Sequence, residues 1–286
     1  MTPGRAAVRM LAVAAFILLA LALMGVAIWW EQERIVFQPS PPPYPDGAPA
    51  QRIELRSDDG RTLHAFVVGD TASARRNGAV LMFHGNADLA AWRVPWGVEV
   101  ARRTGRMVVL AEYRGYGGIP GPPSVVGVRN DAEAVLAWTR EATGLPMSRI
   151  ALYGHSLGSA VAAELAVTHP PEVLLLESPF SSARDMARII IAAPLERMWR
   201  LVSRVHYDTE ARLRSLDAPV WVVHGTEDLI IPFRMGQAVF DAARRQGRML
   251  PVSGAGHNDV AETGGQVYWR WLTDALSTEA REQPAP

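Results

Sequence analysis

The stretch that decides the fold is Ile150-Ala-Leu-Tyr-Gly-His-Ser-Leu-Gly-Ser159. Residues 150–153 are an apolar run with the length of a buried strand. After the turn, apolar residues recur at helical spacing, at Leu157, Val161 and Leu165. Gly-x-Ser-x-Gly between a strand and a helix is typical of an exposed nucleophile, because glycine lets the strand and helix approach closely. We therefore predict Ser156 at the apex of a tight turn, with Gly154 and Gly158 as its glycines.

Composition narrows the classes of protein that the chain can belong to. It has 286 residues, of which 49% are hydrophobic, enough for one sizeable core. The 29 basic residues are all arginine, are scattered along the chain and are balanced by 29 acidic residues, so we expect no nucleic-acid partner. The absence of cysteine and lysine excludes disulfides, thiolate chemistry and lysine Schiff bases. We see no metal-ligand spacing, and we expect neither a cofactor nor a metal.

The N-terminal region contains a continuous apolar run, Met10–Trp30, long enough to cross a hydrocarbon core of ~30 Å. A cleaved signal peptide is the alternative, but its apolar part is shorter and ends at small residues, whereas this run ends at Ile28-Trp-Trp30. We therefore predict an uncleaved signal-anchor helix. Arg5 and Arg9 precede it without nearby acids, which predicts a cytoplasmic segment 1–9 and a domain on the extracytoplasmic, periplasmic side.

The rest of the chain divides by composition. Residues 31–50 are predicted to be a juxtamembrane linker, because half of Pro39–Ala50 is proline. Residues 51–276 form the predicted domain and 277–286 a disordered polar tail. Asp58-Asp-Gly60 predicts a hairpin between 52–56 and 62–68. Further buried strands are predicted at 79–83, 107–111, 150–153, 173–177 and 220–223, and helices at 126–143, 235–246 and 267–276. This alternation predicts an α/β fold with a mostly parallel sheet covered on both faces.

A serine nucleophile needs a base, and the base needs a group that orients it. Asp228 follows the predicted strand 220–223, at a sheet edge where ligands gather, with Glu227 as its rival. His257 lies in a glycine-rich loop before the last helix, from which it can reach Ser156 and Asp228. We expect structural or surface roles for the other histidines. His64, His169 and His206 lie away from these motifs. The His155 side chain is expected outside the reaction centre, and His224 is expected to position its loop.

An oxyanion requires two backbone N–H donors. The amide of Leu157 follows the nucleophile directly, and a second amide is expected from the loop after strand 79–83. We predict that Asn86 supplies it, with Ala87 as the alternative.

These residues lie in segments that together resemble the α/β-hydrolase superfamily, and within it the membrane-anchored, Bem46-like hydrolases grouped with serine aminopeptidase-type domains. The resemblance extends from about Phe37 to Leu276 and rests on HGNA (84–87), EYRGYG (112–117), GHSLG (154–158), LLLESPFSSARDMA (174–187), HGTEDLIIP (224–232) and GAGHND (254–259). It implies an α/β-hydrolase fold and a triad of Ser156, Asp228 and His257, with partners following the serine in the order acid, then histidine. Ile119 and Val125 depart from the usual serine and glutamate of the family, outside the triad.

The expected activity is hydrolysis of an ester or thioester of a small-molecule or lipid-like acyl substrate, because the domain is held next to a membrane. A peptidase or amidase is the enzymatic alternative, since the triad serves all three bonds. A non-catalytic membrane-tethered scaffold with this fold is the alternative of another class. Residues 180–219 carry an apolar segment that either packs on the domain as a plain helix or forms an acyl-binding or membrane-facing surface. The sequence leaves the oligomeric state open.

Overall fold

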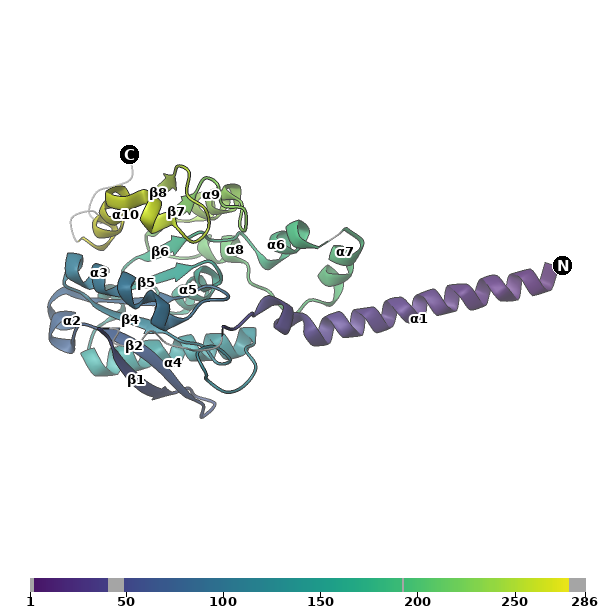
Figure 1. The fold of residues 1–286 in the computed structure, drawn as a ribbon, viewed down its shortest axis with the longest axis horizontal. Helices are drawn as coiled ribbons and strands as arrows, with labels where there is room; N and C mark the ends of the chain where they lie inside the picture. Colours follow the sequence, from purple (N-terminus) through teal and green to yellow (C-terminus); the bar gives the residue numbers. More distant parts are fainter. Residues whose placement is uncertain (1–2, 41–48, 192, 278–286) are drawn as a thin grey trace.

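The computed structural model describes residues 3–40, 49–191 and 193–277. One long helix, α1 (Pro3–Val36), projects as a rod from the body of the molecule (Figure 1). It contains an apolar segment, Ala7–Val36, that is long enough to cross a membrane by length and composition. Most of the proline-rich segment and nearly all of the predicted tail lie outside the described residues.

The body is built on one eight-stranded sheet with the order β1-β2-β4-β3-β5-β6-β7-β8. The strands are β1 (Gln51–Arg56), β2 (Thr62–Val68), β3 (Ala79–Phe83), β4 (Met107–Ala111), β5 (Ile150–His155), β6 (Leu174–Glu177), β7 (Val220–Gly225) and β8 (Gln246–Val252). The β1–β2 and β2–β4 pairs are antiparallel, and every pair from β4 through β3 to β8 is parallel. The prediction of an α/β-hydrolase fold with a mostly parallel sheet is confirmed.

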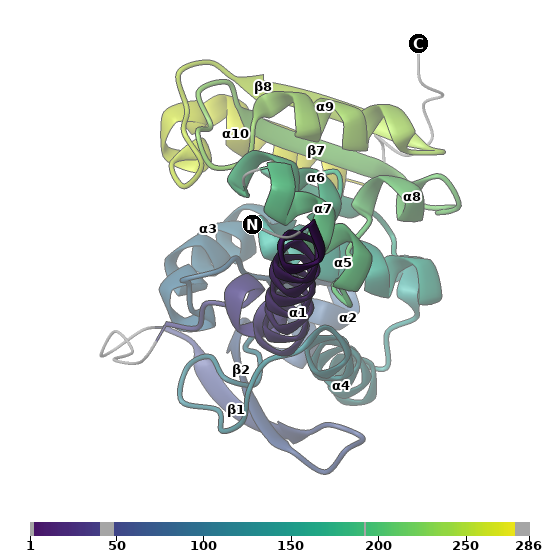
Figure 2. The ribbon, with the colours of Figure 1, turned by 90° about the vertical axis from the view of Figure 1, so that its right-hand side faces the viewer.

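Helices cover both faces of this sheet (Figures 1 and 2). Residues of α3 (Val94–Thr104) and α10 (Val260–Leu276) pack in the apolar cluster on one face. The cluster on the other face takes residues from α4 (Val125–Thr143), α5 (Leu157–Thr168), α8 (Thr209–Leu213) and α9 (Phe233–Ala242). The central strands contribute to both clusters: in β3, Leu81 belongs to one and Met82 to the other. This two-sided burial explains why they are continuous apolar runs.

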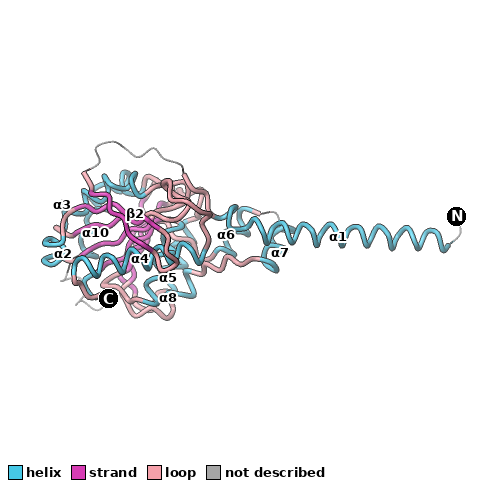
Figure 3. Tube along the Cα trace, turned by 90° about the horizontal axis from the view of Figure 1, so that it is seen from below, coloured by secondary structure: helices cyan, strands magenta, loops and turns pink. Residues whose placement is uncertain are grey.

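The remaining elements are short. Helix α2 (Thr71–Asn77) joins β2 to β3, and the 3₁₀ turns η1 (Ala90–Arg93) and η2 (Met147–Arg149) precede α3 and β5. Helices α6 (Ala183–Ile190) and α7 (Ala193–Val202) form a hairpin that stands out from the sheet toward α1 (Figures 1 and 3). The apolar segment predicted within residues 180–219 forms this hairpin.

Three element boundaries differ from the sequence prediction. Helix α9 ends at Ala242, and Gln246 starts the edge strand β8, so the predicted helix 235–246 is too long. At the start of β8 the backbone passes close to the Trp221 side chain. Position 247 therefore requires glycine, since a Cβ there would lie 2.1 Å from Trp221 Nε1. Helix α10 starts at Val260 and changes direction at Gly265, whose φ is +47°. Helix α1 continues to Val36, past the predicted end at Trp30, because residues 31–36 contain neither glycine nor proline.

Candidate active site

Ser156 lies at the turn between β5 and α5 with a φ of +53°, a left-handed conformation that is uncommon for residues other than glycine. The turn is tight on both sides. A Cβ on Gly154 would lie 2.3 Å from the Gly158 carbonyl oxygen, and one on Gly158 would lie 2.0 Å from the Phe83 carbonyl oxygen. The Ser156 amide donates to the Glu177 carbonyl at 2.9 Å. Close packing of β3, β5 and α5 thus holds the strained serine in place.

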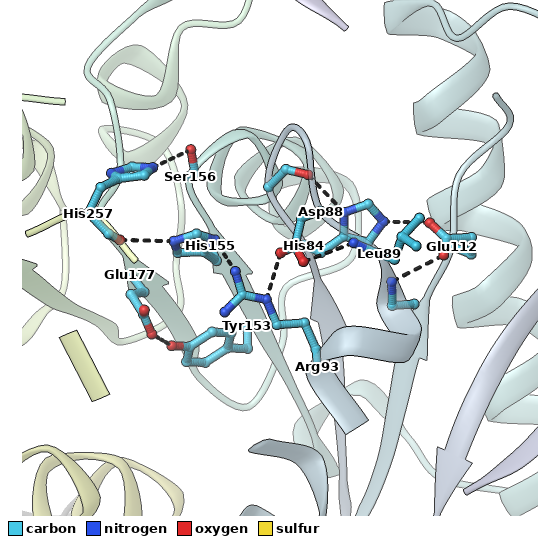
Figure 4. Close-up of polar contacts among 12 residues, drawn as sticks. His84, Asp88, Leu89, Arg93, Glu112, Tyr153, His155, Ser156, Glu177 and His257 are labelled. Atoms are coloured by element: carbon cyan, nitrogen blue, oxygen red, sulfur yellow. Dashed lines mark hydrogen bonds and ion pairs between the residues drawn. The ribbon is translucent and has the colours of Figure 1, made fainter. Parts of the chain in front are cut away.

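The three predicted triad side chains meet at the carboxyl edge of the sheet. His257 Nε2 lies 2.9 Å from Ser156 Oγ, and His257 Nδ1 lies 2.7 Å from Asp228 Oδ2. Because a carboxylate only accepts, Nδ1 carries the hydrogen and Nε2 is left to accept from the serine hydroxyl. The arrangement links a serine hydroxyl to a base and the base to an orienting acid. Figure 4 shows the His257 ring beside Ser156.

Asp228 is buried among donors, whereas its rival Glu227 is exposed. Its Oδ1 accepts from the amides of Ile230 and Ile231 at 2.9 and 2.8 Å. Burial alone would raise the pKa of Asp228, but hydrogen bonds from His224 and His257 outweigh burial and hold it below the usual range. Asp228 therefore stays a carboxylate at neutral pH.

His224 is a second histidine against Asp228, with Nε2 3.1 Å from Asp228 Oδ2 and 2.8 Å from the Ile231 carbonyl oxygen. Both are acceptors, so Nε2 carries the hydrogen. A Cβ on Gly236 would lie 2.2 Å from His224 Nδ1, so α9 packs directly against the His224 ring. Among the described residues, those that line the cavity around Ser156 do not include His224, and its role in positioning the loop stays a prediction.

His155 supports the site through the backbone of His257, a role that the sequence did not reveal (Figure 4). Arg93 Nη2 lies 3.2 Å from His155 Nδ1, and His155 Nε2 lies 3.3 Å from the His257 carbonyl oxygen. Since arginine only donates, Nδ1 accepts and Nε2–H donates to that carbonyl. Burial, followed by the charge of Arg93, lowers the pKa of His155 well below its usual value, which keeps the ring neutral. Asp88 in turn accepts from Arg93 Nε at 2.6 Å.

The loop after β3 lies against the serine: a Cβ on Gly85 would lie 3.1 Å from Ser156 Cβ. The Ala87 amide is already bonded to the Gln38 carbonyl oxygen at 2.9 Å, so the alternative oxyanion donor is occupied. The Asn86 side chain is held on three sides: Nδ2 donates to the Val36 carbonyl oxygen at 2.5 Å, and Oδ1 accepts from the Gln38 amide at 3.1 Å and from Tyr116 Oη at 2.6 Å. The end of α1 therefore fixes this loop, a contact that the linker prediction for 31–50 missed.

A buried ion pair fixes the start of the same loop. His84 Nε2 lies 2.7 Å from Glu112 Oε1, and its Nδ1 lies 2.8 Å from the Gly85 carbonyl oxygen. Both partners are acceptors, so both ring nitrogens carry hydrogen. Burial opposes this charge, yet the Glu112 carboxylate outweighs burial and raises the pKa of His84. The signal was present in the sequence, since His84 and Glu112 each directly follow a predicted strand, but it required knowing that β3 and β4 are neighbours.

Ser156 and His257 open into a cavity of about 630 Å³. Its walls come from the loop after β3, from the end of α1 and from the α6–α7 hairpin. The apolar part of its lining consists of Ile35, Val36, Ala87, Trp92, Leu157, Phe180, Ala183, Met186, Ala187, Ile190, Ile191, Trp199, Ile230 and Ile231. A concave, mostly apolar site with a few convergent polar groups is typical of a small-molecule pocket. Over the described ranges, no group of three or more His, Asp or Glu side chains is arranged to hold a metal ion.

Comparison with known proteins identifies the family. Residues 78–205 match the α/β hydrolase fold family. The chain is 36% identical over 275 residues to the uncharacterized protein Rv2307c of Mycobacterium tuberculosis, covering 93% of this chain and 96% of that protein. It is 25% identical over 282 residues to protein bem46 of Schizosaccharomyces pombe, covering 93% of each.

Among solved structures, the fold is similar to esterase Pf2001 of Pyrococcus furiosus, with a TM-score of 0.66. The match covers 84% of this chain and 97% of the esterase at 16% sequence identity, so it concerns the fold alone. The long match to Rv2307c establishes relationship over nearly the whole chain. The chain belongs to the α/β-hydrolase superfamily, as a Bem46-like member with an apolar N-terminal helix.

Proposed function

We propose that this chain is a membrane-anchored serine hydrolase that cleaves the ester or thioester bond of an acyl substrate. The observation that carries the proposal is the hydrogen-bonded path from Ser156 Oγ through the His257 ring to Asp228, at one end of an apolar cavity. A buried carboxylate, an oriented imidazole and a hydroxyl at these distances are what nucleophilic acyl transfer requires.

In the proposed reaction, Ser156 Oγ attacks the carbonyl carbon of the substrate while His257 Nε2 accepts the hydroxyl proton. The oxyanion faces the amides of Leu157 and Asn86. His257 then gives the proton to the departing alcohol or thiol, which leaves an acyl group on Ser156. Water, deprotonated by the same nitrogen, attacks the acyl-enzyme. The bond from the acyl carbon to Ser156 Oγ then breaks, Nε2 returns its proton to Oγ, and the acid is released. Asp228 holds the Nδ1–H tautomer and stabilises the imidazolium in both halves.

The cavity lining favours an acyl substrate over a peptide. Most of its walls are aliphatic or aromatic, and their polar groups gather around Ser156, so an alkyl chain gains burial without leaving polar groups unpaired. A peptide would carry backbone groups into an apolar wall that offers them few partners.

The proposed location is a single pass through the membrane with the N-terminus in the cytoplasm. Helix α1 has the length for the crossing, and Arg5 and Arg9 precede its apolar run with no acid beside them. The hydrolase domain then lies on the extracytoplasmic side.

A fluorophosphonate probe tests the proposal on the full chain in detergent or nanodiscs. We expect the wild type to be labelled, and Ser156→Ala and His257→Ala to lose labelling by a factor of about 10³ or more. His169→Ala is the matched control, because it removes a histidine that is paired with Glu133 at 2.8 Å outside the site. A folded wild type that is not labelled would contradict an activated serine and favour a scaffold role. An ester and thioester series of increasing chain length then ranks the substrates.

A further inference from the structure

Helix α7 packs on α1 at a depth that belongs to the membrane. Gly25 is buried, and a Cβ at this position would lie 3.9 Å from both Met198 Sδ and Val202 Cγ1 of α7. Gly25 precedes the aromatic pair Trp29-Trp30, which is typical of a membrane interface, by four to five residues. At 1.5 Å per residue this places the contact about 6–8 Å on the hydrocarbon side of the pair. Part of α7 therefore lies at the level of the acyl chains.

A polar contact fixes the same pair of elements at the level of the aromatic residues. The Gln32 side chain is fully buried, accepts from the Arg204 amide and donates to the Trp29 carbonyl oxygen at 2.8 Å. The Arg204 guanidinium lies 4.2 Å from the centre of the Trp29 ring and donates to the Trp29 carbonyl oxygen at 3.1 Å. The position of the α6–α7 hairpin relative to α1 is thus set by apolar packing at Gly25 and by hydrogen bonds at Trp29 and Gln32.

The outer side of the hairpin is apolar and exposed. Ile190 is 71% exposed and Leu201 is 86% exposed, and Ile189 and Leu195 are partly exposed. Residues 184–204 carry five arginines against two acids, and Arg184, Arg188, Arg197 and Arg200 are exposed. An exposed apolar surface with basic residues around it is typical of a segment that rests in a bilayer interface with anionic headgroups.

The cavity opens on this side of the molecule. Ile35 and Ile190 line the cavity and are also 52% and 71% exposed, so both lie at its mouth, with Trp92 and Ile230 on the rest of the rim. Ile35 follows Trp30 by five residues, or about 7–8 Å along the helix, which is within the headgroup layer. The cavity therefore runs from the headgroup level to Ser156.

We propose that the α6–α7 hairpin inserts its apolar side into the bilayer that α1 crosses, and that the cavity takes an acyl chain directly from this leaflet. The occupant of the hairpin surface is lipid, because α7 is already packed on the spanning segment. The substrate is a membrane-resident acyl ester or thioester whose carbonyl reaches Ser156 while its chain lies between the end of α1 and the hairpin. The substrate assignment rests on the proposed activity. The insertion of the hairpin rests on the proposed crossing of the membrane by α1 and does not depend on the activity.

Insertion depth is measured with one cysteine at a time, since the chain has none of its own. Leu201→Cys and the control Val267→Cys are labelled with an environment-sensitive fluorophore in the full chain, both carrying Ser156→Ala. Val267 is 57% exposed on α10, which lies on the side of the body away from α1 (Figure 1). In phosphatidylcholine–phosphatidylglycerol vesicles we expect spin-labelled lipid to quench the Leu201 label at least about threefold more than the Val267 label. The insertion would be overturned if the Leu201 and Val267 labels were quenched to the same extent, both by spin-labelled lipid and by an aqueous quencher. That result is expected if the hairpin binds a protein partner and not lipid.

Substrate entry is measured by comparing two substrates on Leu201→Glu, a residue that does not line the cavity. We expect kcat/KM for a long-chain ester carried in vesicles to fall about tenfold, because a carboxylate disfavours the bilayer. The rate with a short, water-soluble ester and the rates of Val267→Glu are expected to stay at the wild-type level. An equal loss on both substrates, or no loss on either, would overturn lateral entry. A wild type inactive on both substrates would contradict the proposed function and leave the measured depth standing.

Discussion

The cavity has two walls of opposite character. The sheet wall presents Ser156 and His257 on loops at the ends of parallel strands, with Asp228 buried behind His257, and hydrogen bonds fix each side chain. The other wall is made by the end of α1 and the α6–α7 hairpin, and packing of apolar side chains such as Trp199 holds it together. It is called the membrane wall after the insertion proposed above. In the proposed function, the first wall carries out the chemistry and the second holds an alkyl chain. A change in the first should therefore alter the rate for every substrate, and one in the second should alter which substrate is used.

The largest effect is expected at the acid of the sheet wall. Asp228→Asn should lower kcat by about 10⁴-fold, because an amide in place of the carboxylate allows the wrong tautomer of His257. Glu227→Gln, the neighbouring carboxyl, should change kcat less than about twofold, since its side chain is exposed. Steady-state kinetics on a short soluble ester measures both variants. If Glu227→Gln lost more activity than Asp228→Asn, the acid of the triad would be Glu227 and the assignment of Asp228 would be wrong.

A smaller effect is expected where the two walls meet, at the Asn86 side chain. Asn86→Ala removes the bonds to Val36 and Gln38 while keeping the backbone amide proposed for the oxyanion. A displacement of that amide by about 1 Å should lower kcat by roughly 10- to 100-fold. Asn77→Ala is the control, because it deletes a comparable side-chain bond, to Gly105 at 2.9 Å, away from the site. Equal kcat values in the two variants would show that the anchor end does not position the loop.

The smallest effect concerns stability in acid. Because the folded pKa of His155 lies well below its usual value, the unfolded chain binds a proton there that the folded chain does not. This group therefore destabilises the fold as the pH falls below about 6.5. In thermal unfolding between pH 7 and 4.5, His155→Gln should become less destabilised relative to the wild type as the pH falls. Trp199→Phe, on the membrane wall, changes no titratable group and should keep a constant difference in Tm. Parallel pH curves for wild type and His155→Gln would refute the account.

The same contrast explains what the sequence could predict. Strands such as β3 and β5 are buried on both faces, so their apolar runs mark them clearly, and motifs at their ends mark Ser156, Asp228 and His257 as candidates. Contacts between loop residues that follow different strands were harder to predict from the sequence. Arg93 reaches His155 across 62 positions of sequence, and nothing local to Arg93 indicates that contact.

The membrane wall was the least predictable part. Its residues are ordinary apolar ones, and their role depends on α7 lying beside Gly25 and on the Val36 carbonyl reaching Asn86. Neither follows from periodicity, since each joins segments about 50 or more residues apart. A proline-rich segment also favoured a linker directly after Trp30, whereas the helix continues to Val36 and the next residue, Phe37, is buried in the core.

The junction at residues 33–38 means that α1 is not an exchangeable module. Glu33 accepts from the Val125 amide at 3.2 Å, Phe37 fills the core and Gln38 holds the loop beside the serine. A chimera that replaced residues 1–30 with an unrelated spanning helix would keep these contacts but lose the Gly25 surface for α7. A fragment that starts at Phe37 would lose the contact between Glu33 and Val125, so a shortened chain that keeps this junction must start no later than residue 31.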